Sequence, residues 1–316
     1  MKKNKILILG ASSFGGLSAT IHFLDKGYNI VGTYNKNKKK LITTLKKLKL
    51  TNKMTLEKLD LKSNSLKLNQ IVKKYKPSLI IDFASICLVP ESWDNPLDYF
   101  EINVDSKIPF WKNLNNFDYL KKYIYISTPE IFGSSNRPVK ENSTKYNPST
   151  PYALSKLTAE SLIRLFQKSH KNKKFIIARF SNFYGPMQDK NRLIPKVLKS
   201  IRLKKIFPLH GEGKTIGNFI YADDFCEGIF KILKFGKKGS TYHFTSNEYL
   251  TIKNIVKKIY KFKNENFLNN VKLVPDRKGK DFCYKLSSIS THRALRFKPK
   301  TNLDKGIKLI SNFIEN

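Results

Sequence analysis

A tyrosine and a lysine four residues apart form the pair in this sequence that is best suited to acid–base chemistry. Tyr152 and Lys156 lie in the run Tyr-Ala-Leu-Ser-Lys, directly after Pro151. Residues four apart share one face of a helix, so the two side chains can converge on one point. An ammonium beside a phenol favours the phenolate and lowers its pKa from about 10 toward neutrality. The spacing therefore predicts that Tyr152 exchanges a proton during a hydroxyl–ketone interconversion.

Two hydroxyl residues precede this pair. Ser127 and Thr128 close a predicted strand over residues 122–127. A Tyr–Lys pair at this spacing also arises by chance, and its specificity comes from the upstream hydroxyls and from a glycine-rich turn near the N-terminus. Together these features predict one catalytic site, in which Lys156 also holds the ribose of a nicotinamide cofactor.

The glycine-rich turn lies between a predicted strand at 5–9 and a predicted helix at 15–25. Glycine permits the tight turn and the close packing of helix on strand, and the free N–H groups of the helix then face a pyrophosphate. The position of the middle glycine of the dinucleotide motif is occupied by serine, so a plain turn is the alternative. The residues of this turn that we expect to bind the cofactor are Gly10, Ser13, Phe14 and Gly16.

The end of the second predicted strand, at 29–34, bears on the choice of cofactor. NAD sites usually place an acidic residue there to bind the ribose hydroxyls. Here the chain continues with Asn35 and Lys36, and three more lysines follow at 38–40. We expect Asn35 and Lys36 to contact the cofactor. The ammonium groups favour NADP over NAD, because they could accept a 2′-phosphate.

Buried hydrophobic runs and amphipathic stretches alternate along the first part of the chain. This pattern predicts an α/β protein with a Rossmann-type, doubly wound parallel sheet. We expect a cofactor domain over 1–179 and a smaller C-terminal substrate-binding domain over 180–316, with about 217–235 returning to the first domain. The predicted strands are 5–9, 29–34, 54–59, 79–83, 122–127 and 175–179, and the predicted helices are 15–25, 38–50, 66–75 and 151–166.

The formal net charge of the 316-residue chain is +36. Dense lysine can attract a polyanionic partner. It can also reflect a general compositional bias, which we favour because the lysines are spread along the chain and nucleic-acid-binding signatures are missing. We therefore predict no nucleic-acid partner, and we expect the positive field to attract a doubly negative nucleotide sugar.

Cysteine, histidine and apolar runs argue against several other classes of protein. The three cysteines are odd in number and far apart, and the five histidines form no cluster with metal-ligand spacing. No apolar run approaches the ~20 residues of a membrane span, and the N-terminal run is too short for a signal peptide. We therefore expect no metal site, no membrane partner and a cytoplasmic location.

These motifs, in this order, resemble the extended short-chain dehydrogenase/reductases, in the NAD-dependent epimerase/dehydratase family of nucleotide-sugar enzymes. The resemblance covers nearly the whole chain and implies a nucleotide-sugar substrate, a homodimer and a role in carbohydrate biosynthesis such as that of lipopolysaccharide. It implies cofactor contacts at Asp60, Leu61, Ala84 and Ser85. It implies substrate contacts at Thr128, Asn182, Arg192 and Leu193, with Arg277 as a candidate phosphate partner.

Within this family the resemblance implies 4,6-dehydration of a nucleotide hexose, because Glu130 occupies the place of the dehydratase base. Tyr152 would take the proton of the 4-hydroxyl while hydride passes from C4 to NAD(P)+. Glu130 would then remove the C5 proton, water would leave from C6, and hydride would return to C6. Thr128 would hydrogen-bond the 4-oxygen. A simple 4-epimerase needs no base for C5.

Three departures from the family pattern are visible. Pro129 stands where related dehydratases carry an acid that protonates the leaving hydroxyl, and proline can donate nothing. Gly217 and Asn218 replace an Arg-Asp pair that includes a phosphate contact, and Phe282 and Cys283 replace basic residues. Two alternatives stay open: a nucleotide-sugar 4-epimerase or 4-ketoreductase that uses Tyr152 and Lys156 alone, and a catalytically silent NAD(P)-binding scaffold.

Overall fold

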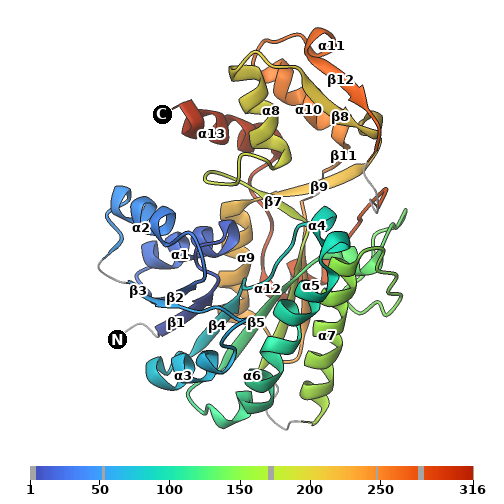
Figure 1. Cartoon of the computed structure of the whole chain (residues 1–316). Coiled ribbons are helices and arrows are strands. Elements are labelled where there is room, and N and C mark those ends of the chain that lie inside the picture. The colour runs from blue at the N-terminus through green and yellow to red at the C-terminus, as the bar shows by residue number, and fades with distance from the viewer. Residues whose placement is uncertain (1–4, 52–53, 170–173, 247, 277–280, 316) are drawn as a thin grey trace.

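A seven-stranded parallel sheet forms the centre of the larger lobe in the computed structural model, which describes residues 5–51, 54–169, 174–246, 248–276 and 281–315. The strand order is β10-β6-β5-β4-β1-β2-β3 (Figure 1). The strands are β1 (Lys5–Leu9), β2 (Asn29–Tyr34), β3 (Met54–Lys58), β4 (Leu79–Asp82), β5 (Lys122–Ser127), β6 (Phe175–Phe180) and β10 (Thr241–Phe244). The inner strands read as near-continuous apolar runs because both faces of the sheet are covered.

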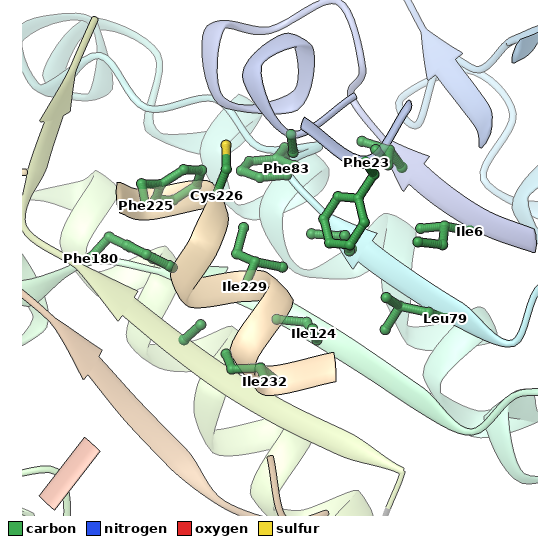
Figure 2. Packing of buried hydrophobic residues seen from close by; sticks show 14 of the residues in the cluster. Ile6, Phe23, Leu79, Phe83, Ile124, Phe180, Phe225, Cys226, Ile229 and Ile232 are labelled. Atoms are coloured by element: carbon green, nitrogen blue, oxygen red, sulfur yellow. The ribbon is translucent and has the colours of Figure 1, made fainter. Parts of the chain in front are cut away.

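Helices cover both faces of this sheet. One face carries α1 (Phe14–Asp25), α2 (Lys38–Lys47), α9 (Ala222–Phe235) and α12 (Ile289–Leu295). The other carries α3 (Leu66–Tyr75), α6 (Ile108–Asn113) and α7 (Pro151–Ser169). Figure 2 shows the first face, where Phe225, Ile229 and Ile232 of α9 point toward strand residues such as Ile124 and Phe180. These two buried layers hold the carboxyl ends of the parallel strands in place.

The expectation of an α/β fold with a Rossmann-type parallel sheet is confirmed by this topology. The predicted strands and helices form, with ends that differ by a few residues. Helix α9 packs on the large sheet and strand β10 pairs with β6 at the sheet edge, and the return of the chain to the first domain over about 217–235 stays a prediction. The division of the chain at residue 179 stays a prediction.

A smaller lobe is built mainly from later residues around its own buried cluster. Its helices α8, α10 and α11 lie with β8 and β12 at one end of the molecule (Figure 1). The elements are β7 (Asn182–Tyr184), α8 (Leu193–Arg202), β8 (Phe207–His210), β9 (Ile216–Tyr221), β11 (Tyr249–Thr251), α10 (Ile252–Phe262), α11 (Phe267–Asn270), β12 (Val271–Val274) and α13 (Leu303–Glu315). They form a three-stranded sheet, β11-β9-β7, and a two-stranded sheet, β12-β8.

The order of the large sheet reverses between β1 and β4. Strand β1 pairs with β2 on one side and with β4 on the other, so the connections from their carboxyl ends run to opposite sides. In open parallel sheets this switch point leaves a crevice in which ligands bind. Among the described residues, no helix is both long enough and apolar enough to span a membrane.

Candidate active site

The turn after β1 has a backbone suited to a dinucleotide. Gly10 has φ +72°, and its N–H donates to Thr33 Oγ1 at 3.0 Å. Ser13 caps α1: its Oγ accepts from Gly16 N at 3.1 Å and donates to Gly10 O at 2.7 Å. A Cβ on Gly16 would collide with the carbonyl oxygen of Gly10. Ser13, at the middle position of the motif, therefore stabilises the turn. Helix α1 packs closely on β1, as a pyrophosphate site at a helix N-terminus requires.

Two neighbouring segments border this turn. A Cβ on Gly10 would meet the Ala84 backbone nitrogen at 3.1 Å, so the chain after β4 lies directly beside the turn. The Phe14 ring stacks on Phe183, with centroids 5.3 Å apart. Of the expected cofactor residues, Gly10, Ser13, Phe14, Gly16 and Ala84 are thus brought together. Their role in binding a dinucleotide stays a prediction.

The other expected cofactor contacts lie at the ends of β2 and β3. Asn35 and Lys36 are exposed just after β2. Asp60 accepts a hydrogen bond from Lys62 N at 3.1 Å, and Leu61 is buried in the core. Their exposed or half-exposed positions leave Asn35, Lys36 and Asp60 accessible to a ligand, and their cofactor role stays a prediction.

Tyr152 and Lys156 occupy the first turns of α7, where the sequence predicted them. Lys156 Nζ donates to Ser85 Oγ at 3.1 Å and to the Ile126 carbonyl at 2.8 Å, and lies 4.1 Å over the centre of the Tyr125 ring. Burial, together with the charge of the nearby Lys107 ammonium, lowers the pKa of Lys156 to about 7. The lysine is therefore fixed between α7 and the ends of β4 and β5.

The predicted lowering of the Tyr152 pKa toward neutrality is wrong for this structure. Burial raises the pKa of Tyr152 well above its ordinary value and the charge of Glu130 raises it further, whereas a hydrogen bond with Thr128 and the Arg192 charge lower it. The helical spacing was correct. However, the Lys156 ammonium donates to Ser85 and to a strand carbonyl. Sharing a helix face with Tyr152 therefore does not lead Lys156 to stabilise the charged form of the phenol.

Glu130 enters the site from a short 3-10 helix, η4 (Pro129–Phe132), that follows β5. Thr128 caps this helix, its Oγ1 accepting from Glu130 N at 3.3 Å. Glu130 Oε2 is buried and has no hydrogen-bond partner among the described residues. Burial raises the pKa of Glu130 to about 8, the Asp281 charge also raises it, and the Arg192 charge lowers it. A buried carboxyl with one free oxygen is suited to proton transfer near neutral pH.

The expected substrate contacts fall into two groups. Arg192 caps α8, and its charge acts on both Glu130 and Tyr152. Its Nη2 lies 3.7 Å from the Cys87 sulfur. Asn182 is exposed at the start of β7, and no interaction among the described residues places it beside the acid–base residues. Leu193 packs against the core of the smaller lobe, and Arg277 lies outside the described residues.

The structure adds residues that the sequence analysis did not assign to the site. The pKa of Tyr284 is raised by burial and by the charges of Glu130 and Asp281, and Tyr152 also contributes. Tyr284 therefore lies among these groups. Asp281 directly precedes Phe282, one of the departures from the family pattern, but nothing in the sequence marked Tyr284, because it lies far from Glu130 and Tyr152 along the chain.

A buried ion pair lies near Lys156. Lys107 Nζ lies 2.7 Å from Asp82 Oδ2, and both side chains are inaccessible to solvent. Asp82 Oδ1 accepts from Ala84 N at 2.9 Å, and Tyr123 donates to Oδ2 at 2.5 Å. The pair holds the chain after β4 in place, and its cationic partner lowers the pKa of Lys156.

The second departure from the family pattern has a structural explanation. Asn218 Nδ2 donates to the Ser246 carbonyl and Oγ, both at 2.8 Å, and to the Glu248 carbonyl at 2.7 Å. Its Oδ1 accepts from Thr245 Oγ1 at 2.5 Å. Both polar atoms of this amide are used within the protein, so Asn218 holds Thr245, Ser246 and Glu248 and leaves phosphate binding to other residues.

Comparison with known proteins agrees with this geometry. The model of the NAD dependent epimerase/dehydratase family matches residues 6–244. The chain is 25% identical to a dTDP-glucose 4,6-dehydratase of Shigella flexneri over 99% of this chain and 95% of that protein. Its fold is similar to DesIV, a dTDP-glucose 4,6-dehydratase of Streptomyces venezuelae solved with NAD (TM-score 0.89, 21% identity, 98% and 97% of the two chains covered). It is also similar to a UDP-glucuronic acid 4-epimerase of Bacillus cereus solved with UDP-glucuronic acid and NAD (TM-score 0.88, 21%, 98% and 99%).

Proposed function

Because the chain belongs to the NAD dependent epimerase/dehydratase family, we propose that it is a nucleotide-sugar 4,6-dehydratase-like enzyme acting on a nucleotide hexose. The observation that carries this proposal is Glu130, a buried carboxyl with an unpartnered oxygen and a pKa raised to about 8 by burial. Dehydration needs a base at C5, and a 4-epimerase does not. The full-length similarity to a dTDP-glucose 4,6-dehydratase supports the same assignment.

Each of the assembled residues has a task in this reaction. Tyr152 takes the proton of the sugar 4-hydroxyl, and Thr128, hydrogen-bonded to Tyr152, holds the 4-oxygen. Glu130 removes the C5 proton once C4 is a ketone. Lys156 orients the ribose, from a place fixed by Ser85. A nicotinamide cofactor, which the Gly10 turn and Lys156 would hold, would supply the hydride chemistry at C4 and C6.

The cofactor is NAD or NADP, and related structures solved with NAD support NAD. The residues after β2 favour NADP, since Asn35 and Lys36 are exposed and no carboxylate stands there. Dissociation constants of NAD+ and NADP+ measured side by side decide between the two. Loss of NADP+ binding in Lys36→Ala, with NAD+ binding kept, would support the 2′-phosphate contact.

A second candidate is a nucleotide-sugar 4-epimerase or 4-ketoreductase, and Pro129 is the observation that favours it. Pro129 is buried beside Glu130 and has no proton to give to a leaving hydroxyl. An enzyme that uses Tyr152 and Lys156 alone has no need of such a donor.

The decisive experiment incubates the protein with a panel of nucleotide hexoses and either cofactor, and measures the mass of the sugar product. Loss of one water from one substrate establishes dehydration, and Glu130→Gln should abolish it. An unchanged mass with altered stereochemistry would establish an epimerase. Loss of water at an unchanged rate in Glu130→Gln would contradict the role of Glu130.

We also propose a homodimer that pairs through the helices beside the site. The neighbouring helices α4 (Val89–Asp94), α5 (Pro96–Asn103) and α7 carry exposed large apolar side chains, with Trp93 51%, Leu97 81% and Leu154 44% exposed. Exposed apolar side chains on adjacent helices are typical of an association surface.

A cytoplasmic location is supported by three free cysteines, which suit a reducing compartment.

A further inference from the structure

A buried carboxylate joins two distant parts of the chain beside the site. Asp281 is almost completely buried. Its Oδ2 accepts from Ser149 Oγ at 2.6 Å and its Oδ1 accepts from Ser134 Oγ at 3.2 Å. Ser134 Oγ in turn accepts from Phe282 N at 2.8 Å. Both serines belong to the loop that connects Glu130 with Tyr152, so this loop is tied to the segment after the smaller lobe.

Backbone contacts continue the same attachment. Ser135 N donates to the Cys283 carbonyl and Ile216 N to the Phe282 carbonyl, each at 2.9 Å. Val139 N donates to the Lys285 carbonyl at 2.9 Å. The 281–285 segment therefore lies between the active-site loop and β9 of the smaller lobe.

Asp281 also contributes to the charge around Glu130. The groups that act on Glu130 come from three directions: Asp281 with Tyr284 from the C-terminal segment, Tyr152 from α7, and Arg192 from the start of α8. Within this set Asp281 supplies the negative charge and Arg192 the positive one. Hydroxyl donors orient the Asp281 carboxylate, so its position relative to Glu130 is fixed.

We propose that Asp281 is a positioning residue of the active site: it holds the loop between Glu130 and Tyr152 against the C-terminal segment and sets the negative charge that Glu130 meets. This inference rests on the proposed function for its kinetic consequence. A carboxyl that works as a base must be ionised at the working pH yet strong enough to take a proton from carbon. The Asp281 charge favours the proton-bound form of Glu130 and so makes its carboxylate a stronger base.

The test compares Asp281→Asn with Ser149→Ala. The first removes the charge and keeps a side chain of the same shape. The second removes the 2.6 Å hydrogen bond and keeps the charge. In Asp281→Asn, the acid limb of the pH profile of kcat/KM should move to lower pH by about one unit, because a neighbouring like charge shifts a carboxyl by this order. In Ser149→Ala the limb should stay in place while kcat falls.

A direct readout needs no turnover. In protein labelled with 13C at the glutamate carboxyl, the Glu130 signal is the one missing from Glu130→Gln, and its titration gives the pKa. A lower titration midpoint in Asp281→Asn, with an unchanged midpoint in Ser149→Ala, supports the proposal. Equal midpoints in the wild type and Asp281→Asn, in protein whose melting temperature shows that it is folded, would overturn it. If Asp281→Asn does not fold, Asp281→Glu, which keeps the charge, should fold and keep the wild-type midpoint, and a midpoint moved to lower pH would overturn the proposal.

The two readouts separate this proposal from the proposed function. If no nucleotide hexose loses water, the dehydratase assignment fails, and the titration of Glu130 still decides the role of Asp281. If dehydration is found and the titration midpoints are equal, the function stands and the inference about Asp281 falls.

Discussion

The pKa values of the proton-transfer groups in this protein depend more on their surroundings than on their residue type. Tyr152 is buried and Glu130 is half-buried with its Oε2 inaccessible, and burial raises the pKa of each. Lys156 responds in the opposite direction, to about 7, because burial disfavours its charged form. In the proposed reaction Glu130 is the base and Lys156 the ribose-binding group, and both have pKa values near neutral pH, where proton transfer by a positioned side chain is efficient.

The buried Glu130 carboxyl should destabilise the fold at alkaline pH. Its folded pKa, about 8, lies above the ordinary value of 4.5, so the folded state holds a proton that the unfolded state has released between these values. Stability therefore falls as pH rises from 4.5 to 8. We expect Glu130→Gln to melt at a higher temperature than the wild type at pH 9 and at nearly the same temperature at pH 4. Differential scanning calorimetry of the cofactor-free proteins measures this.

Removing the Tyr152 hydroxyl should stop hydride transfer without preventing cofactor binding. Tyr152 is the group proposed to take the 4-hydroxyl proton, and general acid–base groups contribute about 10²–10⁴-fold to rate. In Tyr152→Phe, formation of reduced cofactor in a single turnover should fall by this order. Tyr99→Phe is the matched control, because Tyr99 packs on Tyr152 but donates to the Leu88 carbonyl. An equal loss in both variants would contradict the role given to the Tyr152 hydroxyl.

At the scale of elements, the site depends on how closely helices approach strand ends. Helix α1 lies against β1 because Gly16 has no side chain to meet Gly10. Helix α7 is tied to β6 by Glu160 and Arg179, which form two hydrogen bonds at 2.9 and 2.6 Å inside the protein. The first contact fixes the cofactor turn, and the second fixes the helix that carries Tyr152 and Lys156.

The close approach of α1 predicts a strong effect of one added methyl group. In Gly16→Ala, the new Cβ would collide with the Gly10 carbonyl, so α1 must move away from the turn. We expect the dissociation constant for NAD+ to rise at least about tenfold, a cost of ~1.4 kcal/mol. Isothermal titration calorimetry measures it, and Ala11→Gly, a change in the same turn without added bulk, should bind nearly as well as the wild type. Wild-type affinity in Gly16→Ala would contradict the packing argument.

The buried ion pair between Arg179 and Glu160 predicts that lysine cannot replace arginine at residue 179. Lysine lacks the planar fork that makes two hydrogen bonds to Glu160. It would leave part of a buried carboxylate unsatisfied, and breaking such a pair costs about 3–5 kcal/mol. Urea unfolding should show this loss in Arg179→Lys. Arg164→Lys is the control, since Arg164 is partly exposed and lies 3.5 Å from the same carboxylate. Equal stability of the two variants would show that the buried bonds add nothing.

At the scale of the whole molecule, the buried His243 links the stability of the fold to pH. His243 on β10 contacts Arg179 Nη1 at 3.0 Å and the Ser287 carbonyl at 3.1 Å. Burial lowers its pKa to about 3, and the Arg179 charge also lowers it. The contribution of the neutral His243 to the stability of the fold is fully present above the ordinary histidine pKa of 6.5. It is lost as pH falls, because the unfolded state then binds a proton that the folded state does not.

This linkage predicts an acid-sensitive fold. The free energy of unfolding of the wild type should fall more between pH 7 and pH 5 than that of His243→Gln. Urea titrations at the two pH values give the difference directly. The same pH dependence in both proteins would show that His243 is not the group responsible.

Sequence alone determined the parts of this protein that depend on neighbours along the chain. Apolar runs set the parallel strands, the glycines and Ser13 set the cofactor turn, and the four-residue spacing placed Tyr152 and Lys156 on one helix face. These patterns are local, because helix and strand periodicity and turn chemistry act over a few residues. The helices over residues 89–113 were not predicted, since their short, proline-interrupted turns carry a weak periodic signal.

Only the tertiary structure decided what surrounds each reactive group. It turned Lys156 toward Ser85 and the Ile126 carbonyl, and so overturned the expected lowering of the Tyr152 pKa. It brought Asp281 and Tyr284 to Glu130 from more than a hundred residues away. Burial and charge depend on which distant segments share a site, and spacing along the chain carries no record of them. The candidate reactive residues could therefore be proposed from sequence patterns, whereas the shifts of their pKa values followed from the fold.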